Sequence, residues 1–262
     1  MPAKLPISVT IIAVNEADRI VAAIESVIDW CDEVIVIDSG STDDTVAVAE
    51  QAGARVLYNP WPGYGQQKRF SEDQARNDWI LNIDADERTL PELREEIEQL
   101  FASREALADG YFIAIHDRLY GSDSLSAYTP YKPVRLYRLS QGRYSESPVH
   151  DRVQMNANAR TANLKGRMAH DSVRSFHHRV AKMNGYTEAQ ASDLRARGRK
   201  PSTFRIIIDF WTSFISGYFL RGYWRGGLMG YIYAMNFAYS RFLRQIKLYE
   251  QSCIKTNKDE NI

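Results

Sequence analysis

One short stretch of the chain places three carboxylates directly after an apolar run, and these residues are the strongest candidates for chemistry. The run 79–83 predicts a buried strand, and Asp84, Asp86 and Glu87 follow it. Open α/β sheets bind ligands at the carboxyl ends of their strands. Carboxylate oxygens are the ligands that Mg²⁺ and Mn²⁺ prefer. Asp84 and Asp86, spaced two apart, therefore predict a site for a divalent cation, and a solvated acidic loop is the alternative.

The first part of the chain alternates strands and helices. Apolar, often β-branched runs predict strands over 7–14, 33–37 and 55–58, and helical patterns follow at 20–28, 45–52 and 67–77. Such alternation favours right-handed crossovers and an α/β fold, with a mostly parallel Rossmann-like sheet flanked by helices.

Polar residues follow the first two of these strands. Asn15 and Glu16 come after the first strand, and Asp38 comes after the second. Because the carboxyl ends of parallel strands share one edge of the sheet, we expect these residues near Asp84 and Asp86. Two structural roles are alternatives: Asn15 could cap the following helix, and Asp38 could begin an Asx turn.

The pattern changes after residue 91. A helix is predicted over 91–101, strands over 111–115, 134–139 and 149–153, and helical, aromatic sequence from about residue 174. We therefore predict a catalytic domain over 1–173 and a helical C-terminal region over 174–262. The first holds 18 Lys and Arg against 27 Asp and Glu, and the second holds 15 against 6. The net charge of zero thus hides two halves of opposite charge, which suggests two different partners.

Composition limits the class of protein. The 262 residues are 44% hydrophobic and 25% charged, as in an ordinary folded domain. Two cysteines, Cys31 and Cys253, provide no disulfide framework and suit a reducing compartment. We expect no secretory signal, because no basic region precedes an apolar run at the N-terminus, and no uncharged apolar run is long enough to span a membrane. We expect a cytoplasmic protein, either free in the cytosol or peripheral on the cytoplasmic face of a membrane.

The basic C-terminal region is rich in aromatic residues. Phe, Trp and Tyr stand beside arginines over 204–225, without a spanning length. This pattern is typical of helices that lie at the surface of an anionic membrane. A helical cap on the catalytic core is the alternative. No nucleic-acid partner is expected, because no binding motif accompanies the charge.

Four segments together resemble a known family: TIIAVNEADRI, EVIVIDSGSTDDTVAVAEQAGARV, GQQKRFSEDQARNDWILNIDADE and PVRLYRL…SPVHD. They are similar to the family 2 inverting glycosyltransferases with the A-type nucleotide-sugar fold. Within that family they most resemble the lipopolysaccharide inner-core β-1,4-glucosyltransferases. The resemblance extends over roughly residues 5–250. It implies a UDP-sugar donor, a lipid-linked saccharide acceptor, Mg²⁺ or Mn²⁺ as cofactor, and a place at the inner membrane.

The resemblance also implies roles for individual residues. Asp86 would bind the metal, and Asp84 would contact the ribose or a metal-bound water. Asp38 would accept a hydrogen bond from the uracil, with Asn15 and Glu16 bordering the base and ribose. Lys68 or Arg69 would hold the diphosphate, although a solvated helix face is an equal alternative.

Inversion requires a carboxylate that takes the proton of the acceptor hydroxyl. By resemblance this base is Asp151, although relatives commonly carry Val-His-Glu where this chain has Val149-His150-Asp151. Glu146 and Asp117 are the alternatives, and His150 could orient the base. His170 would complete the metal shell or touch the diphosphate, or be a structural histidine.

Two other functions stay open at this stage. A polyprenyl-phosphate hexosyltransferase would share the first part of the chain, but such enzymes often add spanning helices. A non-catalytic nucleotide-sugar-binding protein would keep the fold without the reaction. Glucose is favoured by resemblance alone, and galactose and N-acetylglucosamine stay possible donors.

Overall fold

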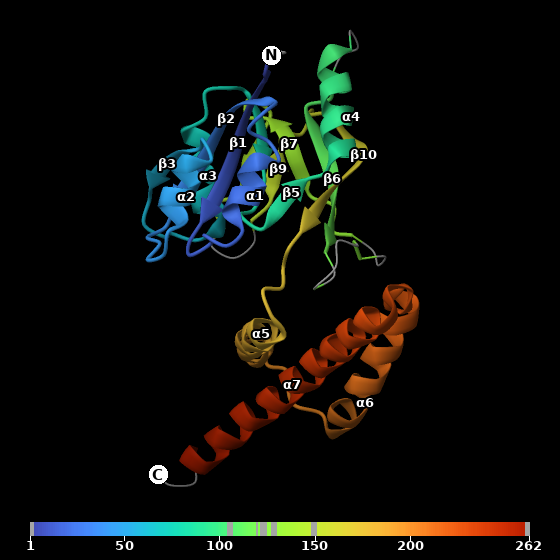
Figure 1. Cartoon of the computed structure of the whole chain (residues 1–262). Helices are drawn as coiled ribbons and strands as arrows, with labels where there is room; N and C mark the ends of the chain where they lie inside the picture. Colours follow the sequence, from blue (N-terminus) through green and yellow to red (C-terminus); the bar gives the residue numbers. More distant parts are fainter. Residues whose placement is uncertain are drawn as a thin grey trace. The chain divides into compact units, whose positions relative to one another are not determined.

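The computed structural model describes residues 3–103, 107–118, 120, 125–126, 130–147 and 151–259. Its contacts divide the chain into two compact units (Figure 1). The first holds Met1–Asp117 and Pro130–Asp171, and the second holds Arg118–Thr129 and Ser172–Ile262. No pattern in the sequence indicated that residues 118–129 belong with the C-terminal residues.

The first unit is built on an eight-stranded sheet in the order β3-β2-β1-β4-β7-β6-β10-β5. Its strands are β1 (Leu5–Ala13), β2 (Cys31–Asp38), β3 (Arg55–Tyr58), β4 (Trp79–Asn82), β5 (Glu87–Thr89), β6 (Gly110–Asp117), β7 (Val134–Arg138) and β10 (Thr161–His170). The pairs β1–β2, β1–β4, β2–β3 and β6–β10 are parallel, whereas β7 pairs antiparallel with β4 and β6, and β5 with β10. A separate hairpin joins β8 (Gly142–Tyr144) to β9 (Val153–Met155). This mostly parallel sheet flanked by helices is the predicted fold class.

The two faces of the sheet differ in chemistry. Side chains alternate along a strand, so Ile7, Val9 and Ile11 of β1 face one side, and Ser8 and Thr10 face the other, all of them buried. The apolar side packs against α1 (Ile20–Glu25) and α4 (Pro91–Ala102). The polar side lies under α3 (Tyr64–Asp73), and α2 (Thr45–Gln51) packs beside α1. The buried polar layer is the one that contains charged side chains.

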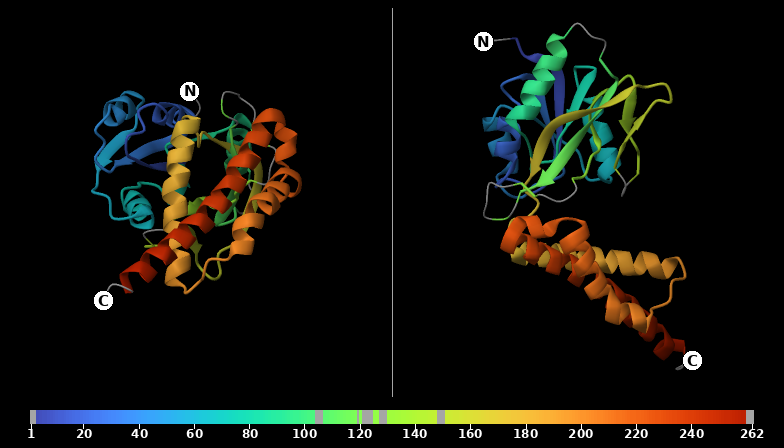
Figure 2. Two further views of the ribbon diagram at one scale, coloured as in Figure 1. Left: turned by 90° about the horizontal axis from the view of Figure 1, so that it is seen from below. Right: turned by 90° about the vertical axis from the view of Figure 1, so that its right-hand side faces the viewer.

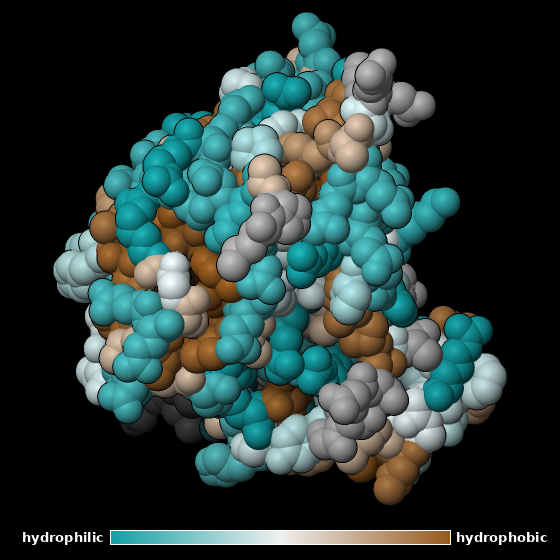
Figure 3. Space-filling model, turned by 45° about the horizontal axis from the view of Figure 1, so that its top comes forward, coloured by the Kyte–Doolittle hydropathy of each residue, from teal (hydrophilic) through white to brown (hydrophobic). Residues whose placement is uncertain are grey.

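Close packing holds α4 on β10, along which it runs in Figure 2. A Cβ added at Gly166 of β10 would lie 2.3 Å from Cα of Leu93, which leaves room for a hydrogen atom alone. Hydrophilic side chains make up most of the surface in Figure 3, with apolar patches between them.

Several predicted elements are corrected. The helix predicted over 67–77 begins at Tyr64 and ends at Asp73. Of the strand predicted over 149–153, residues 149–150 lie outside the described residues, Asp151 and Arg152 are not in a strand, and β9 begins at Val153. Strands β5, β8 and β10 were not predicted from their own sequence. In β10, Lys, Gly and Arg interrupt a half-exposed strand, which obscures the apolar alternation.

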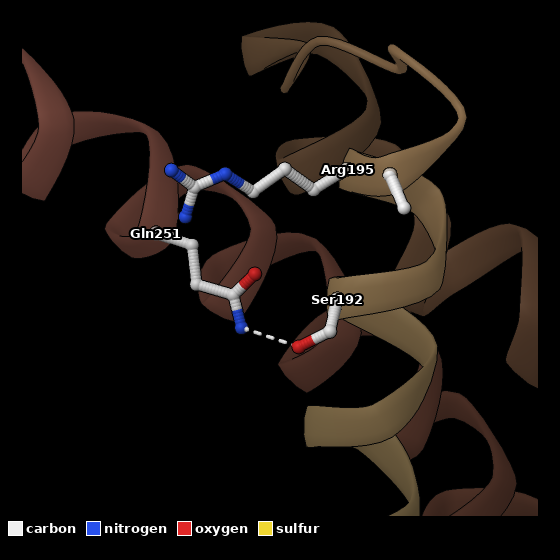
Figure 4. A pocket seen from close by; sticks show the side chains of 4 residues that line it. Ser192, Arg195 and Gln251 are labelled. Atoms are coloured by element: carbon white, nitrogen blue, oxygen red, sulfur yellow. Dashed lines mark hydrogen bonds between the residues drawn. The ribbon is translucent and has the colours of Figure 1, made fainter.

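The second unit is helical. It contains α5 (Phe176–Ala196), α6 (Thr203–Ile215), a π-helical turn (Ser216–Leu220), a 3₁₀ turn (Tyr223–Gly226) and α7 (Gly227–Asp259). Both α5 and α6 pack against α7. Asn184 of α5 accepts from Lys247, and Asp209 of α6 accepts from Gln245 at 2.8 Å. A shallow pocket opens between α5 and α7, where Gln251 donates to Ser192 (Figure 4). Among the described residues, no helix has the length and apolar character needed to cross a membrane.

Candidate functional site

The Asp84 carboxylate lies between two buried cations. Its Oδ1 is 2.8 Å from Nζ of Lys68, and its Oδ2 is 3.0 Å from Nη2 of Arg135. Only 2% of Lys68 and 4% of Arg135 is exposed. Burial alone would raise the pKa of Asp84, but Arg135 and Lys68 hold it well below its usual range. Burial likewise lowers the pKa of Lys68, but Asp84, Tyr144 and Asp151 together raise it above its usual range, so Lys68 stays charged beside Asp84.

Arg135 also fixes the backbone that carries these acids. It donates to Oδ1 of Asn82 at 2.6 Å and to Oε1 of Glu87 at 2.8 Å. The other oxygen of Glu87 accepts from the Asp84 backbone N–H at 2.9 Å. Tyr144 donates its hydroxyl to Asn82 at 2.7 Å. Arg135 was not among the predicted site residues, although an arginine inside the apolar run of β7 was a signal that could have identified it.

Lys68 connects Asp84 to the predicted base. Its Nζ is 2.8 Å from Oδ2 of Asp151 as well as from Asp84. The solvated helix face considered for Lys68 is therefore wrong, because the side chain is buried. Arg69, the next residue, instead pairs at 3.6 Å with Glu146, whose side chain is 73% exposed.

The chain that leads to Asp151 is held against the start of α3. The Gly65 backbone N–H donates to the Ser147 carbonyl at 3.1 Å. A Cβ at Gly65 would lie 2.0 Å from the Ser145 carbonyl oxygen, so only glycine permits this approach. His150, considered as a partner of Asp151, lies outside the described residues.

A second group of side chains surrounds Asp86. Its Oδ2 is 3.4 Å from Nε2 of His170 and 3.3 Å from Nη1 of Arg19. The Nδ1 of His170 lies 2.8 Å from Asp117, which the register of β6 and β10 places opposite it. Burial lowers the pKa of His170, but its hydrogen bonds to Asp117 and Asp86 raise it to about 10. Asp117, an alternative base, is thus already paired with His170.

Arg19 joins this group to the end of β1. Its Nε donates to Oε2 of Glu16 at 2.9 Å, and its Nη1 donates to the Asp171 carbonyl at 2.8 Å. The arginine therefore lies between Glu16 and Asp86. It was not among the predicted site residues, and its sequence context carried no signal.

Asn15 and Asp38 shape the turn beside the same edge. Asn15 has a φ of 55°, and its Oδ1 accepts from the Thr42 backbone N–H at 2.8 Å. The helix-cap role considered for Asn15 is wrong, because α1 begins after Arg19 without a side-chain cap. Asp38 accepts from the backbone N–H groups of Gly40 and Ser41 at 2.8 and 3.0 Å, which is the Asx-type turn considered for it. Its role in binding a base stays a prediction.

Asp86 and His170 are the side chains here that could hold a divalent metal together. Among the described residues, no three His, Cys, Asp or Glu side chains converge on one point. One carboxylate oxygen of Asp86 and one imidazole nitrogen of His170 do lie 3.4 Å apart. Two protein ligands suit a cation that keeps waters and takes substrate phosphates for the rest of its shell. An imidazolium must lose its proton to ligate.

The chain is similar to several known proteins. The model of the glycosyl transferase family 2 matches residues 8–164. An uncharacterized glycosyltransferase of Rickettsia bellii is 42% identical over 94% of this chain and 87% of its own. The lipopolysaccharide core biosynthesis glycosyltransferase LpsC of Rhizobium meliloti is 35% identical over 96% of this chain and 95% of its own. A crystal structure of glucosyl-3-phosphoglycerate synthase from Mycobacterium tuberculosis overlaps 75% of this chain and 81% of that one at 20% identity, with a TM-score of 0.45. That overlap is too loose to support a functional comparison.

Replacing Lys68 with Met should lower the free energy of unfolding by about 2 kcal/mol, measured by urea denaturation. The substitution leaves two carboxylates without their shared cation. The cost stays below that of a fully buried pair, because 36% of the Asp84 and 29% of the Asp151 side chain is exposed. Lys165→Met, at an exposed position of β10, is the control and should change stability by less than about 0.5 kcal/mol. If both substitutions changed the free energy of unfolding equally, the ion pairs of Lys68 would not stabilise the fold.

Proposed function

Because the chain belongs to glycosyl transferase family 2, it is a glycosyltransferase, and we propose that it transfers glucose from UDP-glucose, with inversion, to a lipid-linked saccharide of the lipopolysaccharide core. The observation that carries this proposal is the joining of Lys68, Asp84 and Asp151 through ion pairs at the end of β4. The similarity to LpsC supports a saccharide of the lipopolysaccharide core as acceptor. The glucose donor is favoured by the resemblance described above.

The donor would bind at the edge formed by the ends of β1, β2 and β4. In our proposal Asp38, at the end of β2, accepts from the uracil, and Asn15 and Glu16 border the base and ribose. The register pairs Ala13 of β1 with Asp38, so the residues that follow these strands start from one edge. Asp84 would contact the ribose or a metal-bound water.

Asp86 and His170 are the residues that would hold Mg²⁺ or Mn²⁺. The mixed oxygen and nitrogen set fits Mn²⁺ somewhat better, since Mg²⁺ favours oxygen ligands. A cation bound there would supply charge neutralisation for the departing diphosphate. Arg19, 3.3 Å from Asp86, adds a permanent positive charge beside the same carboxylate.

Asp151 would act as the general base. Its carboxylate would take the proton of the acceptor hydroxyl as that oxygen attacks the anomeric carbon. The ion pair with Lys68, at 2.8 Å, restricts the orientation of this carboxylate. In this proposal Lys68 positions the base. The sequence predicted a different role for it, which was to hold the diphosphate.

Wild-type protein should transfer glucose from UDP-glucose to a heptose-containing lipid acceptor when Mg²⁺ or Mn²⁺ is present, and Asp86→Ala should abolish transfer. Because Asp86 also pairs with Arg19 and His170, the variant should lose some stability, and thermal unfolding would check that it stays folded at the assay temperature. Asp29→Ala, which removes an exposed carboxylate, should keep full activity. Transfer would be measured with radiolabelled donors, including galactose and N-acetylglucosamine. Near-normal turnover of Asp86→Ala with either metal would refute the metal site, and no transfer by wild type from any donor would refute the proposed function.

Replacing Asp151 with Asn should lower kcat by about 10² to 10⁴, the usual contribution of a general base, while UDP still binds with unchanged affinity. Asn has the same shape but cannot accept the proton. Glu146→Gln and Asp117→Asn are the matched controls, measured in the same transfer assay and by calorimetric titration of UDP. If Asp151→Asn keeps its turnover and Glu146→Gln loses it, the base is Glu146. Loss of turnover in Asp117→Asn identifies Asp117 as the base only if metal binding is unchanged, because Asp117 is hydrogen-bonded to His170.

A further inference from the structure

One side of α6 exposes large apolar side chains at helical spacing. Phe204, Ile207, Trp211 and Ile215 recur every three or four residues and are 69%, 65%, 64% and 54% exposed. Not one side chain of α6 is fully buried. In most proteins such a stripe faces the core. We call these four residues the α6 stripe.

The apolar exposure continues beyond α6. Phe219, Leu220, Trp224 and Leu228 are 59%, 83%, 51% and 74% exposed. Eight large apolar side chains are therefore exposed between residues 204 and 228. Scattered exposed apolar residues need no explanation, but a concentration of this kind marks an interaction surface.

The stripe is not the side of α6 that packs on α7. Asp209 accepts from Gln245 of α7, and the ring of Phe214 lies edge-on to Tyr231 at 5.7 Å. These contacts use residues between the stripe positions. The contacts with α7 therefore leave the stripe available to another partner.

The charged residues around this surface are basic, with one exception. Residues 203–249 contain six Lys and Arg and a single acid, Asp209, which is bonded to Gln245. Arg205, Arg221 and Arg225 are exposed among the apolar side chains. An anionic bilayer carries negative headgroups at its surface and apolar acyl chains beneath them. Apolar side chains flanked by cations complement both layers.

An apolar pocket of about 320 Å³ adjoins the stripe. It lies between α6 and α7 and shares Ile207 and Trp211 with the stripe. The residues that line it are Ile206, Ile207, Phe210, Trp211, Tyr239 and Phe242. Hydrocarbon walls of this kind suit the end of an acyl chain.

We propose that the α6 stripe and the apolar side chains at 219–228 bind the surface of an anionic bilayer, with α6 lying in the interface plane. Arg205 and Arg225 contact lipid phosphates, and the α6–α7 pocket receives part of an acyl chain. The proposal concerns attachment to lipid and goes beyond the transfer reaction, because it does not depend on which sugar is moved.

Vesicle sedimentation tests the proposal with the full-length chain. Wild-type protein should bind vesicles of phosphatidylglycerol and phosphatidylcholine at low salt, bind pure phosphatidylcholine less, and detach as salt rises. Trp fluorescence should shift to shorter wavelength on binding, because Trp211 and Trp224 enter an apolar environment. Absence of binding at low salt would overturn the proposal.

Two double variants separate the apolar and the charged contribution. Phe204→Ser with Trp211→Ser, and Arg205→Glu with Arg225→Glu, should each lower the vesicle partition coefficient by about tenfold or more. Arg221 is left unchanged, because its guanidinium packs 4.5 Å from the ring centre of Phe237. Tyr186→Ser, at a 55% exposed position of α5, is the control and should bind like wild type.

Hydrolysis of the soluble donor distinguishes a failure of this proposal from a failure of the proposed function. Every variant should hydrolyse UDP-glucose like wild type, since none changes a residue of the site. Equal loss of vesicle binding in Tyr186→Ser would overturn the assignment of the surface. Sedimentation velocity could also overturn it. If the wild type is a dimer and the Phe204 and Trp211 variant is a monomer, a second copy of the chain occupies the stripe.

Discussion

Two buried cations, Lys68 and Arg135, share the Asp84 carboxylate, and this arrangement constrains the rest of the first unit. Each cation has lost almost all contact with water, a cost that only nearby negative charge offsets. The partners come from α3, from the end of β4 and from β7, which are far apart in sequence. Their ion pairs hold the elements on the polar face of the sheet together. On the opposite face, apolar packing under α1 and α4 does so.

This arrangement separates the tasks of two neighbouring acids. Asp84 is held by two cations on opposite oxygens, so its position is set before any ligand arrives. Asp86 instead lies beside His170 and Arg19 at longer distances of 3.4 and 3.3 Å. A carboxylate with looser partners can exchange them for a cation, which is why we assign the metal to Asp86 and a positioning role to the Asp84 network.

The sequence predicted the parts of this site that depend on local patterns. Strand ends followed by acids predicted Asp84, Asp86 and Asp38 at one edge, and the sheet places β1, β2 and β4 side by side as expected. Arg135 and Arg19 could not be placed, because their roles depend on pairings across 51 and 67 residues of chain. Lys68 was identified, but its burial was not, because its spacing on α3 does not show whether that side is buried. The strand β10 was hidden by its alternation with charged residues.

Anomalous X-ray diffraction can test whether the edge beyond β4 binds a metal and a nucleotide diphosphate through Asp86. Crystals grown with UDP and Mn²⁺ would be measured at a wavelength where manganese scatters anomalously. We expect a manganese peak at the Asp86 carboxylate, beside the bound diphosphate. Bound UDP with no manganese peak at Asp86, or with the peak on other residues, would contradict it.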